Sequence, residues 1–208
     1  MLAALTGAGL SAAAGLNAFI PFVLVGMLDR FTGLLELPAS LDWISSWWAI
    51  GGGMLLLVID VVFDKVPGID HVSDALQTAV RPLMGGLVFA ASSAAARFEG
   101  ADWWQDNPWI GVGIGLLLAG TVHAGKALSR PIVNAGTFGL GGPFVSAAED
   151  ATSATVSIVA ILLPILVVLV LVGIAVALWR ILAFRRRWRA RRAAGRPTSG
   201  TAPAPPTP

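Results

Sequence analysis

The sequence predicts an all-α integral membrane protein, and three observations support this prediction. Apolar residues make up 56% of the 208 residues and charged residues only 12%, whereas soluble domains contain about 25% charged residues. Residues 158–179 contain no charged or strongly polar side chain, and about 20 apolar residues are enough to cross a bilayer core. The other apolar stretches are rich in Gly and Ala, the small residues that let membrane helices pack closely.

We expect about six transmembrane or broken helices, arranged as three tandem hairpins in a transmembrane domain that covers residues 1–184. The first span has no positive charge before Arg30, so it lacks the basic start of a signal peptide and is expected to be retained. Pro164 lies inside the last span and predicts a kink near Ala160. The hairpins cover about residues 8–65, 82–127 and 131–184, with apolar stretches at about 8–28, 47–63, 82–96, 109–127 and 158–179.

Two segments differ from a plain membrane span. Residues 132–148 contain Gly-Gly-Pro at 141–143 and several hydroxyl and amide side chains, which predicts a broken helix that is either spanning or re-entrant. Non-helical backbone survives at membrane depth only where protein buries it or where it lines a cavity. Residues 67–82 place their apolar side chains on one helical stripe, which predicts a short amphipathic helix along the inner surface.

Basic residues are concentrated at the C-terminus. Eight of the fourteen Lys and Arg lie at or after Arg180, whereas all twelve Asp and Glu precede it. Because cytoplasmic loops are enriched in Lys and Arg, we expect both termini in the cytoplasm, loops 29–46 and 99–108 outside, and the protein in a bacterial inner membrane. Residues 185–208 form a basic and then Pro-rich tail, which we expect to be disordered and to contact anionic lipid headgroups, not nucleic acid.

An internal repeat relates the first two predicted hairpins. Arg-Phe-Thr-Gly at 30–33 is matched by Arg-Phe-Glu-Gly at 97–100, and an Asp-Trp pair follows each of them. Residues 55–65 then align with residues 116–126 at a constant offset of 61. Such a repeat has parallel topology, with its axis along the membrane normal.

Five segments form an ordered set of motifs. They are GLNAFIP at 15–21, DKVPGIDHVSD at 64–74, Arg-Pro at 81–82, NPW at 107–109 and HAGKALSRPIVNAGTFGLGGPFVSAAED at 123–150. Together they resemble the bacterial membrane family named domain of unknown function 4126. The resemblance implies a multi-pass membrane protein, but it implies neither catalytic residues nor a substrate.

Ionisable side chains at membrane depth are costly and therefore indicate function. Asp60 and Asp64 share one face of the second predicted span, and His123 shares a face with Lys126. We expect these groups to meet between hairpins, with Asp60 paired to His123, Lys126 or Arg130; a static pairing that only neutralises charge is the alternative. The candidate binding residues are Asn17, Asp60, Asp64, Arg81, His123, Lys126, Arg130, Asn134, Glu149 and Asp150.

Metal binding is a less favoured interpretation of a small group of acids and histidine. Asp70, His71 and Asp74 are acceptable ligands, and His71 and Asp74 have the spacing of one helix face. Such residues more often form only the solvated face of a helix. We therefore expect neither a metal nor another cofactor, and the absence of cysteine excludes disulfides and thiol chemistry.

Three classes of function remain. The chain has no GxxxxGKS phosphate loop, which excludes ATP-driven transport by this chain alone. It also has no HExxH or GxSxG motif of the hydrolases. The favoured interpretation is a small transporter or channel-like permease for an unidentified small ion or solute. One alternative is a non-catalytic assembly or accessory subunit, with a homo-oligomer among the open arrangements. The other, less favoured, is an enzyme that acts on a lipid phosphate held by Arg81, Arg130 and Lys126.

Overall fold

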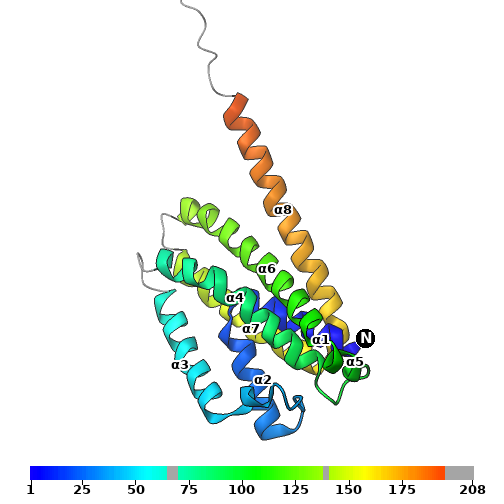
Figure 1. The fold of residues 1–208 in the computed structure, drawn as a ribbon. Helices are drawn as coiled ribbons and strands as arrows, with labels where there is room; N and C mark the ends of the chain where they lie inside the picture. The colour runs from blue at the N-terminus through cyan, green and yellow to red at the C-terminus, as the bar shows by residue number, and fades with distance from the viewer. Residues whose placement is uncertain (65–69, 138–140, 195–208) are drawn as a thin grey trace, which may run out of the picture.

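The computed structural model describes residues 1–64, 70–137 and 141–194, including their side chains except those of residues 70–75, 130–137 and 188–194. These residues form eight α-helices and two 3-10 helices with no strand among them, which confirms the predicted all-α class (Figure 1). In chain order the elements are α1 (Leu2–Leu16), α2 (Phe19–Thr32), η1 (Asp42–Ser45), α3 (Trp47–Phe63), α4 (Asp70–Ser93), α5 (Ala101–Asp106), α6 (Pro108–Thr137), α7 (Gly142–Leu162), η2 (Pro164–Leu166) and α8 (Val167–Ala194).

Helix α1 forms the centre of the bundle and packs against α4, α6 and α7. Eleven of its fifteen residues are buried, and nearly all of these are Ala, Gly, Ser or Thr. The Ser11 hydroxyl donates toward the carbonyl oxygens of Gly85 at 3.0 Å and Gly115 at 2.7 Å. Side chains this small bring the backbones close together, as they do in membrane helix pairs.

Helix α4 runs antiparallel to α1. Gly7 lies against the later half of α4, whereas the Gly15 carbonyl accepts a hydrogen bond from Arg81 near the middle of α4. The start of α1 therefore lies where α4 ends, and a Cβ atom on Gly100 would lie 4.0 Å from the Met1 nitrogen. The sequence predicts that the N-terminus and the connection between α4 and α6 lie at opposite ends of the bundle. In the structure these two parts of the chain lie at the same end.

The first predicted span consists of two helices instead of one. Helix α1 ends at Leu16, Asn17 is extended with φ −140° and ψ 120°, and α2 follows. Helix α2 runs back toward the end of the bundle where α1 begins, because the loop after it contacts the residues after α4. There the Ala96 amide donates to the Glu36 carbonyl at 3.0 Å, and the Arg97 side chain donates to the Leu34 carbonyl.

The broken helix predicted at 132–148 is not a separate span. Residues up to Thr137 complete α6, and residues from Gly142 onward form α7. Pro143 stands in the first turn of α7, where a backbone N–H has no intrahelical partner and its loss costs little. Residues 138–140 lie outside the described part of the chain, and the Gly-Gly-Pro motif at 141–143 lies at the start of α7.

Two prolines account for the other differences from prediction. Pro82 lies inside α4, which begins at Asp70, so the described part of the amphipathic segment predicted at 67–82 is continuous with the span that follows it. Pro164 does more than kink the last span, because the 3-10 turn η2 separates α7 from α8 and the chain reverses there (Figure 1). A residue before proline is driven out of the α region, and Leu163 has φ −137° and ψ 61°.

The outer surface of the bundle is apolar. The segment Pro164–Arg187, which contains most of α8, is the most exposed of the candidate spans, since only 6% of its apolar stretch is buried. Leu169 and Trp179 are each 68% exposed. Large apolar side chains on the outside suit contact with lipid, and the length and composition of these helices suggest a membrane protein. The described helical segments that are long and apolar enough to cross a membrane are Pro108–Ser129, Gly142–Leu162 and Pro164–Arg187.

Gly9 leaves no room for a side chain at the centre of the bundle. A Cβ atom there would lie 2.6 Å from Ala160 Cβ and 2.7 Å from a Val167 methyl group. Gly9→Ala should lower the free energy of unfolding by about 1 to 3 kcal/mol, the usual cost of overpacking a core, and reduce the thermal midpoint in detergent. Gly113→Ala is the matched control, because nothing lies within 4 Å of a Cβ atom there. Equal midpoints for both variants would contradict this packing of α1.

Candidate functional site

Asn17 connects two helix ends inside the bundle. It is fully buried, and its Oδ1 accepts hydrogen bonds from the Phe19 amide at 3.0 Å and the Ile20 amide at 3.2 Å. The first amides of a helix have no intrahelical partner, and side chains such as Asn commonly satisfy them. The Asn17 side chain therefore stabilises the start of α2.

Two cations bind the carboxyl end of α1. Arg81 Nη1 of α4 and Lys126 Nζ of α6 donate to the carbonyl oxygens of Gly15 and Leu16, each at 3.3 Å. The last carbonyls of a helix lack partners and carry partial negative charge. Arg81 is 1% exposed and Lys126 5%, and in an apolar environment water does not reach such carbonyls. The two cations therefore allow α1 to end inside the bundle.

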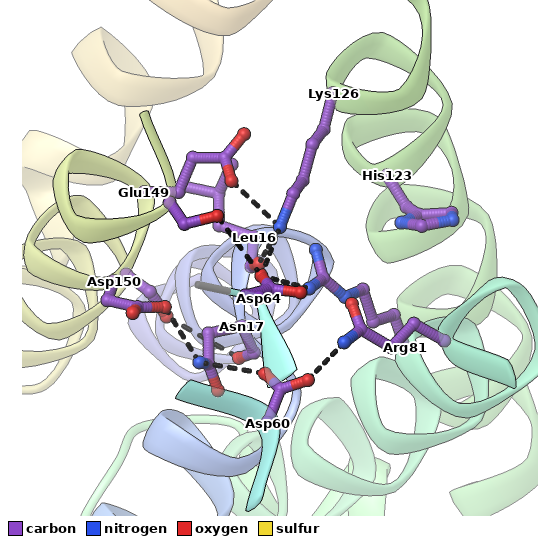
Figure 2. Close-up of polar contacts among 12 residues, drawn as sticks. Leu16, Asn17, Asp60, Asp64, Arg81, His123, Lys126, Glu149 and Asp150 are labelled. Carbon is purple, nitrogen blue, oxygen red and sulfur yellow. Dashed lines mark hydrogen bonds and ion pairs between the residues drawn. The ribbon is translucent and has the colours of Figure 1, made fainter. Parts of the chain in front are cut away.

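The same cations also hold carboxylates (Figure 2). Lys126 Nζ lies 2.8 Å from Glu149 Oε2 and 3.6 Å from Asp64 Oδ2, and Arg81 Nη2 lies 4.0 Å from Asp64 Oδ2. The Ser146 hydroxyl donates to Asp64 Oδ2 at 3.3 Å. Buried charges need partners of this kind. These contacts join α4, α6, α7 and the end of α3 around the end of α1.

Asp60 and Asp150 are bound by amides instead of cations. Asn17 Nδ2 donates to Asp60 Oδ2 at 3.2 Å and to Asp150 Oδ1 at 2.9 Å (Figure 2). Gln77 Nε2 donates to the other oxygen of Asp60. Among the described side chains, no Lys or Arg nitrogen lies within 4.0 Å of either carboxylate. The two N–H donors of one neutral amide thus connect two acids, and we call Asn17, Asp60 and Asp150 the Asn17 bridge.

The structure brings most of the predicted binding residues into one region. His123 lies at its edge, with Nε2 3.2 Å from Thr78 Oγ1. The side chains of Arg130 and Asn134 lie outside the described part of the chain, as do those of the metal candidates Asp70, His71 and Asp74. The residues brought together are Asn17, Asp60, Asp64, Arg81, His123, Lys126, Glu149 and Asp150 (Figure 2).

The ion pair forms one turn away from its predicted position. The sequence predicts a pair between Asp60 and His123, Lys126 or Arg130. Lys126 contacts Asp64, whereas Asp60 is held by Asn17 and Gln77, and the Arg130 side chain lies outside the described part of the chain. Both acids share a face of α3, and only Asp64, one turn further along, reaches the level of Lys126. The sequence also gave no role to Gln77, although it stands one turn before Arg81 and so shares its helix face.

Replacement of Lys126 tests the ionic group. Lys126→Met leaves Asp64 and Glu149 without this cation, and removing one member of a buried pair costs about 3 to 5 kcal/mol. The thermal midpoint of Lys126→Met in detergent should therefore fall strongly. The midpoint of Lys126→Arg, which keeps the charge, should fall less. The double variant Lys126→Met with Glu149→Gln should recover part of the loss. A double variant less stable than Lys126→Met alone would contradict the pair.

Replacement of Asn17 tests the bridge. Asn17→Ala removes the donors to both acids and the acceptor for two amides, and each orphaned buried group costs about 1 to 3 kcal/mol. We expect the free energy of unfolding to fall by at least about 3 kcal/mol on that basis. The control is Asn107→Ala, since the Asn107 side chain donates only to the Trp103 carbonyl of its own segment. Similar losses in both variants, measured by thermal unfolding, would argue against a central role for Asn17.

Comparison with known proteins places the chain in a family. The model of a family described as Domain of unknown function (DUF4126) matches residues 4–183. Searches of curated proteins and of solved structures found no match. The matched range includes every residue of the Asn17 bridge and of the ionic group around it. The chain therefore belongs to the family Domain of unknown function (DUF4126).

Proposed function

We propose that the protein is a small permease that moves a proton or a small cation through the Asn17 bridge. The observation that carries this proposal is a helix broken inside the bundle, with two carboxylates held at the break by one neutral amide. Discontinuous helices form the ion sites of many secondary transporters, where open helix ends face the ion. Acidic side chains at membrane depth serve as proton relays in pumps and transporters.

The position of the break supports the proposal. Helix α1 has fifteen residues and rises about 22 Å, whereas a bilayer core is about 30 Å thick. Its end contacts Arg81, which has eleven residues of α4 before it and twelve after it. The Asn17 bridge therefore lies near the middle of a membrane-length helix, which is where transporter sites lie.

The charges around the break favour a cation over an anion. Arg81 and Lys126 bind the carbonyls of α1 and the carboxylates of Asp64 and Glu149. The carboxylates of the Asn17 bridge have only neutral donors among the described side chains. Carboxylate oxygens bind small hard cations and also accept protons. A cation or a proton would therefore neutralise charge at the bridge, whereas an anion would add to it.

A second candidate is an assembly subunit, and the surface of α8 favours it. Leu169 and Val172 are 68% and 55% exposed, so helices of another chain could cover this surface instead of lipid. In that case the ionic group only locks helices together. The lipid-phosphate alternative gains no support, because Arg81 is 1% exposed and already binds Gly15 and Asp64.

The internal repeat is part of the proposal, and backbone conformation supports it. Gly33 and Gly100, which hold equivalent repeat positions after α2 and α4, have φ 58° and 79° and are the positive-φ glycines of the described chain. A short helix with an acid in its first turn follows each of them, with Asp42 in η1 and Asp102 in α5. The α2–α3 and α4–α6 hairpins thus share a turn that favours glycine as well as a sequence pattern.

Ion flux into liposomes tests the proposed function. Purified protein reconstituted into liposomes should collapse an imposed pH gradient, or take up radioactive Na⁺ or K⁺, faster than protein-free liposomes. Asp60→Asn and Asp150→Asn should each reduce the flux to the protein-free rate, because each removes a charge from the bridge. Asp106→Asn is the matched control, since Asp106 is exposed at the end of the bundle far from the bridge.

The pattern of fluxes separates the alternatives. Collapse of the pH gradient alone would identify a proton as the transported species. Uptake of Na⁺ or K⁺ alone would identify that metal cation. Rates equal to those of protein-free liposomes for all three ions would overturn the transport proposal and favour the assembly subunit. Equal flux in Asp60→Asn and the wild-type chain would remove the Asn17 bridge from the pathway.

A further inference from the structure

We infer that α1 and α2 form a re-entrant hairpin, which enters the membrane from the face opposite the basic tail and leaves by the same face. The N-terminus then lies on that face, and the segments that cross the membrane are α3, α4, α6, α7 and α8. This inference concerns how the chain reaches the Asn17 bridge, and it stands whether or not the protein transports an ion.

Both ends of the hairpin lie at one end of the bundle (Figure 1). The start of α1 is beside Gly100, in the connection between α4 and α6. The loop after α2 is joined to the same connection, where the Ala96 amide donates to Glu36 and Arg97 donates to the Leu34 carbonyl. A single bent span over these residues would instead place the N-terminus at the opposite end from Glu36.

The tip of the hairpin lies at half the depth of its neighbours. Helices α1 and α2 have fifteen and fourteen residues, so each rises only about 21 to 22 Å and falls short of the roughly 17 to 25 residues that a transmembrane helix needs. On α7, the Ser153 hydroxyl donates to the Ala13 carbonyl at 2.9 Å. Arg81, near the middle of α4, binds the Gly15 carbonyl, two residues further along α1.

The backbone at the tip has the partners that membrane depth requires. A chain that turns inside hydrocarbon is tolerated only where protein satisfies its open amides and carbonyls. The carbonyls of Gly15 and Leu16 bind Arg81 and Lys126, and the first amides of α2 bind the Asn17 side chain. The contacts that build the candidate site therefore also allow the hairpin to turn back.

The distribution of charge indicates the membrane face from which the hairpin enters. Helix α8 begins beside Gly9 and passes Gly125 through Leu178, so it runs away from the N-terminus toward the end where α6 finishes. Seven of the eight basic residues from Arg180 onward lie in α8, near that end, which the enrichment of Lys and Arg in the cytoplasm marks as the inner face. Residues 1–29 contain no Lys or Arg, so no basic side chain there favours a cytoplasmic N-terminus.

Cysteine labelling tests this topology directly, because the natural chain has no cysteine. Single cysteines at Leu2 and Ser40 flank the hairpin, a cysteine at Glu99 marks the connection after α4, and a cysteine added after Pro208 marks the tail. Leu2, Ser40 and Glu99 are exposed, so these substitutions should leave the fold intact. In intact cells a membrane-impermeant maleimide should label the first three variants, and the tail variant only after permeabilisation.

The labelling of Leu2→Cys decides between a re-entrant hairpin and two crossing helices. Labelling of Leu2→Cys together with the tail, and of Ser40→Cys together with Glu99→Cys, would show that the first two helices cross the membrane and would overturn the inference. A cysteine in a short extension before Met1 repeats the measurement without changing any native residue. The result is independent of ion flux, so failure of the transport proposal and failure of this topology are distinguishable.

Discussion

Helix α1 ends in the middle of the bundle, and the bonds from Arg81 and Lys126 to its last carbonyls are the interactions on which the rest of the structure depends. Open carbonyls without water are costly, and positive charge stabilises the carboxyl end of a helix. Two buried cations in turn require carboxylates. Asp64 from the end of α3 and Glu149 from α7 supply them, so the ending of one helix draws four others around it.

The four carboxylates at this level have two different environments. Asp64 and Glu149 lie against Lys126, where their charge is neutralised and contributes to the cohesion of the bundle. Asp60 and Asp150 accept only amide hydrogen bonds among the described side chains, which satisfy oxygen lone pairs without adding positive charge. Our proposal that Asp60 and Asp150 handle an ion rests on this difference.

The packing around α1 makes these polar contacts reachable. Because α1 carries mostly Ala, Gly, Ser and Thr on its buried surface, the backbones of α4 and α6 come close enough for the Ser11 hydroxyl to reach both Gly85 and Gly115. Larger side chains would push Arg81 and Lys126 away from the carbonyls that they bind. The apolar bulk lies instead on outer helices such as α8, where it faces outward.

The sequence by itself determined the all-α class, the apolar segments that suggest a membrane protein, and the identity of most polar residues in the site. An ionisable or amide side chain stands out in an apolar run. Only the tertiary structure decided which acid pairs with Lys126, because a shift of one turn along α3 determines whether Asp60 or Asp64 lies beside it. The break at Asn17 is the clearest case. Whether residues 8–28 form one helix or two depends on groups that bind the free carbonyls, and those groups lie 66 and 110 residues away in Arg81 and Lys126. Local sequence does not contain that information, because the cost of an open carbonyl is decided by what stands beside it in space.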